Sequence, residues 1–157
     1  MIIFDLDLTV WECFNKHGEK IWAKQLLPPF NQKKGVIYDD VFSKCNLRKG
    51  IFEYIKWLFN NGNTISFCSV GAYKNLPTSH QPSILLLKKF KLYDFFNGPS
   101  ILEYKNYDKM NFLESILEKS VFYDDNDKIL NDASSLKHID VFDAKKIQDW
   151  SSLIMHQ

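Results

Sequence analysis

The chain lacks long apolar runs, internal repeats and any marked excess of charge of one sign. Its longest hydrophobic stretches span only a few residues, so no membrane-spanning helix is expected. Lysine and arginine number 20 against 19 acidic residues, and no overall field attracts an anionic partner. We therefore expect neither nucleic acid nor a membrane as a partner.

Cysteine is also scarce. Cys13, Cys45 and Cys68 are odd in number and show neither zinc-site nor redox-motif spacing, so they are predicted to be reduced. A secretory leader is not expected, because Asp5 and Asp7 interrupt the region where a basic segment and an apolar stretch would be needed. Both observations indicate a cytoplasmic protein.

The chain does have enough apolar and aromatic material for one core. Hydrophobic residues make up 45% and charged residues 25%, which is ordinary for a globular protein. At 157 residues, a single domain over 1–157 is the default expectation. The 13 Phe, seven Tyr and four Trp predict a core filled by rings, with some rings left to line a site.

The N-terminal segment carries the strongest chemical signal. The apolar run Ile2–Phe4 ends at Asp5, Asp7 follows two positions later, and Thr9 completes an Asp-x-Asp-x-Thr pattern. The run is too short for a helix and predicts a buried strand, whose carboxyl end faces the ligand crevice of an open α/β sheet. Two carboxylates this close repel each other unless a cation, a proton or a polar ligand offsets them. Mg²⁺ shared with a substrate phosphate fits this requirement, although both aspartates could also simply form a turn.

Strands and helices are predicted to alternate along the rest of the chain, which indicates a mainly parallel sheet covered on both faces. The expected helices are 46–62, 84–90, 108–119 with Asp108 as N-cap, 127–134, and a terminal helix carrying Ile147, Trp150, Leu153 and Ile154. The expected strands are 64–69, a weak strand over 99–103, 121–123 and 139–142.

Residues 12–45 lack a clear period and contain Pro28-Pro29, which excludes a helix interior there. We predict a small β-hairpin or flap that leans over the site. Its aromatic residues either line the site wall or merely pack the loop onto the body; they are Trp11, Phe14, Trp22 and Phe30. This insert is too short for an independently folded cap domain.

Polar residues recur at the ends of the predicted strands. Ser69 ends the strand over 64–69, and Asp124 and Asp125 follow the strand over 121–123. Adjacent carboxylates at a buried sheet edge require a cation. Lys109 lies at the start of a predicted helix. Taken alone, this serine indicates a turn and this lysine indicates a solvated surface.

Together these motifs resemble the haloacid dehalogenase-like phosphohydrolase superfamily, whose first motif is apolar-apolar-Asp-x-Asp-x-Thr. The string Phe4-Asp5-Leu6-Asp7-Leu8-Thr9-Val10-Trp11 is most similar to the magnesium-dependent acid phosphatase family, which carries Phe-Asp-Leu-Asp-x-Thr-Leu-Trp. Leu27-Pro28-Pro29-Phe30 resembles that family's Pro-Pro-Phe segment. The resemblance covers nearly the whole chain and is weakest over 12–45 and after 137. It implies an α/β, Rossmann-like three-layer sandwich with a mainly parallel sheet and a minimal, flap-type cap.

The resemblance also implies a role for each motif. Asp5 would be the nucleophile that forms an aspartyl-phosphate, and Asp7 the general acid and base. The implied cofactor is Mg²⁺, with ligands drawn from Asp5, Asp7 (through its backbone carbonyl), Asp124 and Asp125. Asp125 is favoured as the direct ligand, and Asp124 as its support.

Phosphate binding is assigned by the same resemblance to Ser69, Val70 and Lys109. Lys105 is a nearby competitor for the role of Lys109, but the sequence after Lys109 aligns better with the family's helix start. The chain departs from the family at the second motif, where Ser69-Val70-Gly71 replaces Ser-Arg-Thr. The lost arginine removes a possible bidentate contact to phosphate and puts substrate affinity and identity in doubt.

The expected activity is Mg²⁺-dependent hydrolysis of a phosphomonoester. The substrate would be a phosphorylated small molecule or a phosphoprotein: an aryl phosphate, phosphotyrosine or a phosphosugar. One alternative is a catalytically degenerate phosphate- or phosphopeptide-binding module, which the missing arginine favours and the intact first motif opposes. Another is a signalling receiver domain, but there the acidic pair comes first and the phosphorylatable aspartate later, the reverse of the order here. The sequence indicates no oligomeric state.

Overall fold

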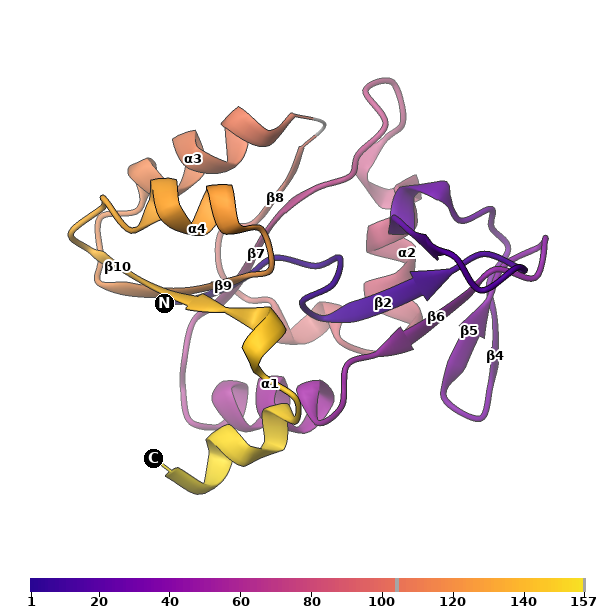
Figure 1. Cartoon of the computed structure of the whole chain (residues 1–157), viewed down its shortest axis with the longest axis horizontal. Coiled ribbons are helices and arrows are strands. Elements are labelled where there is room, and N and C mark those ends of the chain that lie inside the picture. Colours follow the sequence, from indigo (N-terminus) through magenta and orange to yellow (C-terminus); the bar gives the residue numbers. More distant parts are fainter. Residues whose placement is uncertain (104, 157) are drawn as a thin grey trace.

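A parallel sheet of five strands forms the centre of the chain (Figure 1). The computed structural model describes residues 1–103 and 105–156, apart from the side chains at 106, 107, 155 and 156. The strands are β1 (Ile2–Phe4), β7 (Ile65–Val70), β8 (Ile101–Glu103), β9 (Ser120–Asp124) and β10 (Ile139–Asp143). Their order is β10-β9-β1-β7-β8, and every pair is parallel. The predicted α/β class with a mainly parallel sheet is confirmed.

Helices cover both faces of this sheet. On one face, α3 (Asn106–Ser115) and α4 (Asp127–Ala133) pack over Ile3. On the other face, α1 (Ile51–Asn60) and the terminal 3-10 helix Trp150–His156 pack over Phe4. Because consecutive side chains of β1 enter opposite cores, this strand has to be apolar throughout, which explains its continuous hydrophobic run.

A second sheet, antiparallel and also five-stranded, lies beside the first (Figure 1). It contains β2 (Trp11–Phe14), β3 (Lys20–Ile21), β4 (Asn31–Lys33), β5 (Val36–Tyr38) and β6 (Lys44–Leu47), in the order β3-β2-β6-β5-β4. We call residues 11–47 the flap. The flap is larger than the hairpin predicted over 12–45, and α2 (Pro82–Lys89) packs against its 3-10 turn Ala23–Gln25.

The prediction that all three cysteines are reduced is wrong in this structure. Cys13 on β2 pairs directly with Cys45 on β6, and the two form a disulfide with their Cα atoms 4.1 Å apart. The antiparallel register brings them together across a separation of 32 residues, which spacing along the chain does not reveal. Cys68 is a buried free thiol.

Several predicted element boundaries need correction. The helix expected over 46–62 begins only at Ile51, because residues 44–47 pair with β2 as β6 and Gly50 adopts a left-handed φ of 74°. α3 begins at Asn106 and ends at Ser115, which puts Lys105 in the N-cap position and Asp108 in the first turn. The terminal segment forms 3-10 helices at Ala144–Lys146 and Trp150–His156 in place of an α-helix.

The core is rich in rings, as predicted. Phe4, Tyr54, Tyr123 and Trp150 contact one another, with ring centroids 5.0–6.4 Å apart. The hydroxyls of Tyr54 and Tyr123 share a hydrogen bond of 2.9 Å inside this cluster. Within the part of the chain that the structure describes, no helix has the length and apolar character needed to cross a membrane.

Candidate active site

The predicted site residues meet at one edge of the parallel sheet. β1 lies between β7 and β9, so the residues that follow these three strands are neighbours in space. Asp5 and Asp7 follow β1, Val70 and Gly71 end and follow β7, and Asp124 ends β9. The chain runs from β1 outward to β7 and β8 and then returns to β9 on the other side of β1. Such a reversal of strand order is where ligands bind in open α/β sheets.

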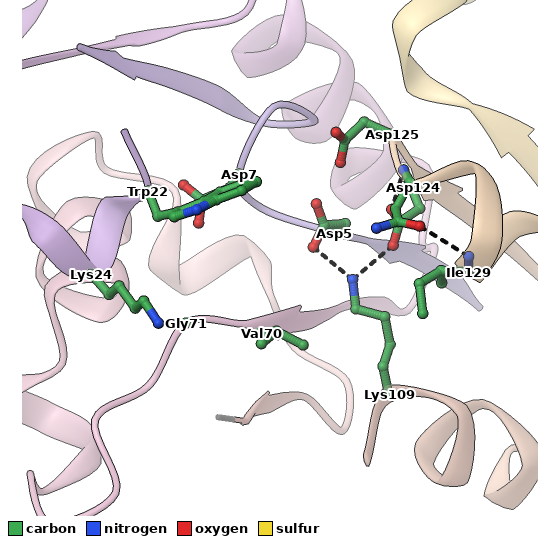
Figure 2. Close-up of a pocket in the computed structure, with 11 residues that line it drawn as sticks. Asp5, Asp7, Trp22, Lys24, Val70, Gly71, Lys109, Asp124, Asp125 and Ile129 are labelled. Atoms are coloured by element: carbon green, nitrogen blue, oxygen red, sulfur yellow. Dashed lines mark hydrogen bonds and ion pairs between the residues drawn. The ribbon is translucent and has the colours of Figure 1, made fainter. Parts of the chain in front are cut away.

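A cavity of about 270 Å³ opens at this edge (Figure 2). Asp5, Asp7, Asp124 and Asp125 all line it, as does Lys109. Further lining residues come from the flap, the end of β7 and the start of α4; they are Trp22, Lys24, Val70, Gly71, Asn126 and Ile129. The cavity is therefore shared by the parallel sheet and the flap.

Lys109 joins two of the carboxylates. Its Nζ lies 2.9 Å from Asp5 Oδ1 and 2.7 Å from Asp124 Oδ2, and all three side chains are buried. Burial by itself lowers the pKa of Lys109, but the negative charges of Asp5 and Asp124 outweigh it and raise that pKa above its ordinary value. Lys109 therefore stays charged. The hydroxyl of Thr9 also faces Asp5, with its Oγ1 3.4 Å from Asp5 Oδ2.

Three carboxylates gather around this lysine. Asp5, Asp124 and Asp125 each offer an oxygen, and these oxygens lie within 4.8 Å of one another. Burial raises the pKa of Asp124 to about 7 and that of Asp125 to about 6, and the charge of Asp5 adds to both shifts. One ammonium does not balance three carboxylates, so a further cation would stabilise the group. Oxygen donors packed this closely are suited to Mg²⁺.

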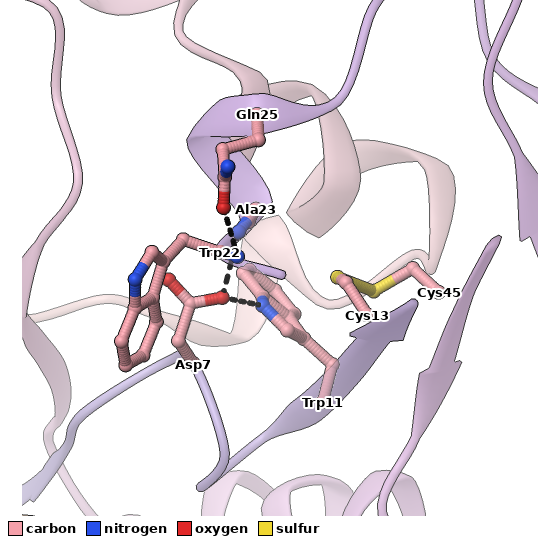
Figure 3. Close-up of a disulfide and its surroundings, with 7 residues drawn as sticks. All are labelled: Asp7, Trp11, Cys13, Trp22, Ala23, Gln25 and Cys45. Atoms are coloured by element: carbon pink, nitrogen blue, oxygen red, sulfur yellow. Dashed lines mark hydrogen bonds between the residues drawn. A yellow bond between two sulfur atoms is a disulfide. The ribbon is translucent and has the colours of Figure 1, made fainter. Parts of the chain in front are cut away.

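Asp7 has a different environment (Figure 3). Its Oδ1 accepts hydrogen bonds of 2.9 Å from the Trp11 indole N–H and from the Ala23 backbone N–H. Its Oδ2 is buried and has no hydrogen-bond partner among the described residues. Burial raises the pKa of Asp7 to about 7 against the opposing effect of the two hydrogen bonds. The carboxylate is thus oriented through one oxygen and leaves the other available.

Gly71 adjoins the available oxygen. A Cβ atom at Gly71 would lie 3.7 Å from Asp7 Oδ2, and its φ of 148° is one that residues with side chains rarely adopt. The carboxylate of Asp7 is not part of the group formed by Asp5, Asp124 and Asp125. Its predicted metal contact, through the backbone carbonyl, stays a prediction.

The predicted phosphate-binding residues differ in whether they line the cavity. Lys109 is buried against the carboxylates, and Val70 lines the cavity. Ser69 is buried at the end of β7 but is not a lining residue, so its predicted hydroxyl contact stays a prediction. Lys105, the competitor of Lys109, is exposed in the N-cap position of α3.

The aromatic residues predicted as possible wall residues divide into different roles. Trp22 lines the cavity, with 51% of its surface exposed, whereas Trp11 is fully buried and holds Asp7. Phe30 lines a separate groove between the flap and α2, and Phe14 is half-buried on β2.

Four residues that line the cavity are not predicted from the sequence: Lys24, Gly71, Asn126 and Ile129. Of these, only Asn126 stands at a position that the sequence could have marked, because asparagine is a common N-cap and Asn126 caps α4.

No protein-family model matches the sequence, and no curated protein gives a significant match. The chemistry of the site therefore has to be inferred from its own geometry and from the motifs.

Proposed function

We propose that the chain is a Mg²⁺-dependent phosphomonoester hydrolase of the haloacid dehalogenase-like type, most similar to magnesium-dependent acid phosphatases. One arrangement carries this proposal: Lys109 bridges Asp5 and Asp124, while Asp7, which lines the same cavity, has one oxygen without a partner among the described residues. This arrangement supplies a nucleophile, a cation for phosphoryl oxygens and a separate proton carrier.

In the first half-reaction, a carboxylate oxygen of Asp5 attacks phosphorus. A phosphorus–oxygen bond forms to Asp5 as the bond to the leaving group breaks, and protonated Asp7 donates its proton to the leaving oxygen. The product is an aspartyl-phosphate on Asp5 and a free alcohol or phenol. A pKa near 7 allows Asp7 to carry that proton at neutral pH.

In the second half-reaction, Asp7 acts as the base. It takes a proton from water as the water oxygen attacks phosphorus, and the bond between phosphorus and Asp5 breaks. Inorganic phosphate leaves, Asp5 regains its carboxylate, and Asp7 is again protonated. The hydrogen bonds from Trp11 and Ala23 hold one oxygen of Asp7 while the other transfers the proton.

Asp5, Asp124 and Asp125 would hold the magnesium ion, which when bound supplies positive charge beside the transferring phosphoryl group. Both oxygens of Asp124 already accept hydrogen bonds, from Lys109 and from the backbone N–H of Asn126. Asp125 is less buried, which favours it as the direct ligand and Asp124 as the residue that orients the group. Lys109, together with Ser69 and Val70 at the end of β7, would face the phosphate.

The proposed architecture is a Rossmann-like three-layer sandwich over 1–157, with the flap as a small cap. Trp22 is half exposed at the cavity, so a flat substrate group could contact its indole. Aryl phosphates or phosphotyrosine are therefore preferred to phosphosugars as proposed substrates. The cytoplasm remains the proposed compartment.

The test is steady-state hydrolysis of para-nitrophenyl phosphate and of a phosphotyrosine peptide, with Mg²⁺ and with excess chelator. We expect turnover with Mg²⁺ that the chelator abolishes and renewed Mg²⁺ restores. Phosphate binding without turnover on either substrate would instead support the binding-module alternative, which Val70 at the cavity wall favours.

A further inference from the structure

Lys24 is a second cation in the cavity and has no role in the chemistry above. It lies in the 3-10 turn Ala23–Gln25 of the flap and is half-buried. Its side chain extends toward the segment that carries Val70 and Gly71 (Figure 2). It therefore enters the cavity from the flap.

The ammonium of Lys24 is not engaged by any side chain or backbone group that the structure describes. Among these described groups, no carboxylate or other acceptor forms an ion pair or hydrogen bond with it. Lys109, in contrast, is held by two carboxylates. Of the two lysines that line the cavity, Lys24 is therefore the one whose charge is available to an incoming anion.

The backbone of Lys24 is fixed in place. The Tyr73 hydroxyl donates a hydrogen bond of 2.7 Å to the Lys24 carbonyl, which joins the flap to the loop after β7. Gln81, which is buried, holds that loop: it accepts from the Tyr73 N–H at 2.8 Å and donates to the carbonyls of Tyr73 and Leu76 at 2.8 and 2.7 Å. The backbone of Lys24 is thus fixed beside the cavity that its side chain lines.

We infer that Lys24 is a phosphate-binding residue of this cavity, clamping the dianion from the flap side while Lys109 holds it from the sheet side. This inference rests on the proposed function for the identity of the anion. A dianion that approaches four lining carboxylates needs cationic partners beyond Lys109, and a lysine serves as a point charge for phosphate.

The experiment measures binding of inorganic phosphate by calorimetry, in the presence of Mg²⁺, for the wild type, Lys24→Gln, Lys24→Arg and Lys33→Gln. Lys33 is the matched control: it is an exposed flap lysine outside the cavity, and its substitution removes the same charge. We expect Lys24→Gln to weaken binding about 10-fold or more, because a hydrogen bond to a charged group is lost. Lys24→Arg should stay within about 3-fold of the wild type, and Lys33→Gln within about 2-fold.

The inference is overturned if Lys24→Gln binds phosphate as the wild type does, if Lys33→Gln weakens binding equally, or if the wild type binds no phosphate. The readout does not depend on turnover. A wild type that binds phosphate through Lys24 but hydrolyses nothing would overturn the proposed activity alone. Turnover with unchanged KM and phosphate affinity in Lys24→Gln would overturn only the role of Lys24.

Discussion

At the scale of single residues, the different roles proposed for Asp5 and Asp7 rest on their different neighbours. Asp5 faces the ammonium of Lys109, with Nζ 2.9 Å from Oδ1. Asp7 faces an indole N–H and a backbone N–H, neither of which carries a charge, and burial raises its pKa to about 7. Two aspartates separated by one residue thus lie in different environments, which supports the proposed roles of Asp5 as nucleophile and Asp7 as proton carrier.

Asp7→Asn tests the proton carrier. The amide can keep its oxygen toward Trp11 and Ala23, so the fold should be retained, but it can neither donate nor accept the transferred proton. We expect turnover to fall about 10²–10⁴-fold, with a smaller loss on substrates whose leaving group is a strong acid. Steady-state rates on two aryl phosphates of different leaving-group pKa check this, with thermal unfolding as the control for folding. Unchanged turnover on both substrates would contradict the role of Asp7 as proton carrier.

At the scale of elements, the flap depends on one buried carboxylate. Asp39 accepts hydrogen bonds from the backbone N–H groups of Leu27, Val41 and Ser43, at 2.9, 3.0 and 2.7 Å. These bonds close the turn between β5 and β6 and attach it to the segment before Pro28. The flap also supplies Ala23 and Trp22 to the site, so its stability affects the geometry of the cavity.

Asp39→Ala should destabilise the flap, because three N–H donors lose a buried charged acceptor. The expected cost is about 2–4 kcal/mol in the free energy of unfolding. Urea unfolding measures it, and amide hydrogen exchange in β5 and β6 locates the loss. Asp40→Ala is the matched control, since Asp40 is the exposed neighbour and its substitution should cost less than about 0.5 kcal/mol. Equal costs for both variants would contradict this role of Asp39.

The sequence predicts elements well where a local pattern determines burial. The apolar stripe of Ile51, Ile55 and Leu58 places α1, and these three side chains are buried. The start of α1 lies later than the sequence predicts, because residues 44–47 form a strand only by pairing with β2, which is distant in sequence. Within the site, the strand ends locate Asp5 and Asp124, whereas Lys24 enters through tertiary packing of the flap and leaves no periodic signal.

At the scale of the whole molecule, the topology concentrates negative charge at one sheet edge. The folded protein raises the pKa of Asp124 and Asp7 to about 7 and that of Asp125 to about 6, mainly through burial. A carboxyl whose folded pKa is raised binds its proton more tightly in the folded state than in the unfolded state. The raised pKa therefore stabilises the folded state in full below the ordinary pKa near 3.8. This stabilisation is lost as the pH rises toward 6–7.

Mg²⁺ should therefore stabilise the protein most where the carboxyls are ionised. Protons and Mg²⁺ compete for the same oxygens, so we expect millimolar Mg²⁺ to raise the melting temperature more at pH 8 than at pH 5.5. Thermal unfolding at both pH values, with Mg²⁺ and with chelator, measures this. In Asp125→Asn, the Mg²⁺-induced rise in melting temperature should differ less between the two pH values. An Mg²⁺ effect of equal size at both pH values, or one undiminished in Asp125→Asn, would contradict metal binding by these carboxylates.

The most direct measurement is Mg²⁺-dependent turnover of an aryl phosphate by the wild type and by Asp5→Asn. An amide of nearly the same shape cannot attack phosphorus, and Lys109 keeps its contact with Asp124, so the variant should fold and bind phosphate. The proposed nucleophile predicts turnover in the wild type and none above background in Asp5→Asn, with similar melting temperatures. Equal turnover in the two proteins would contradict it.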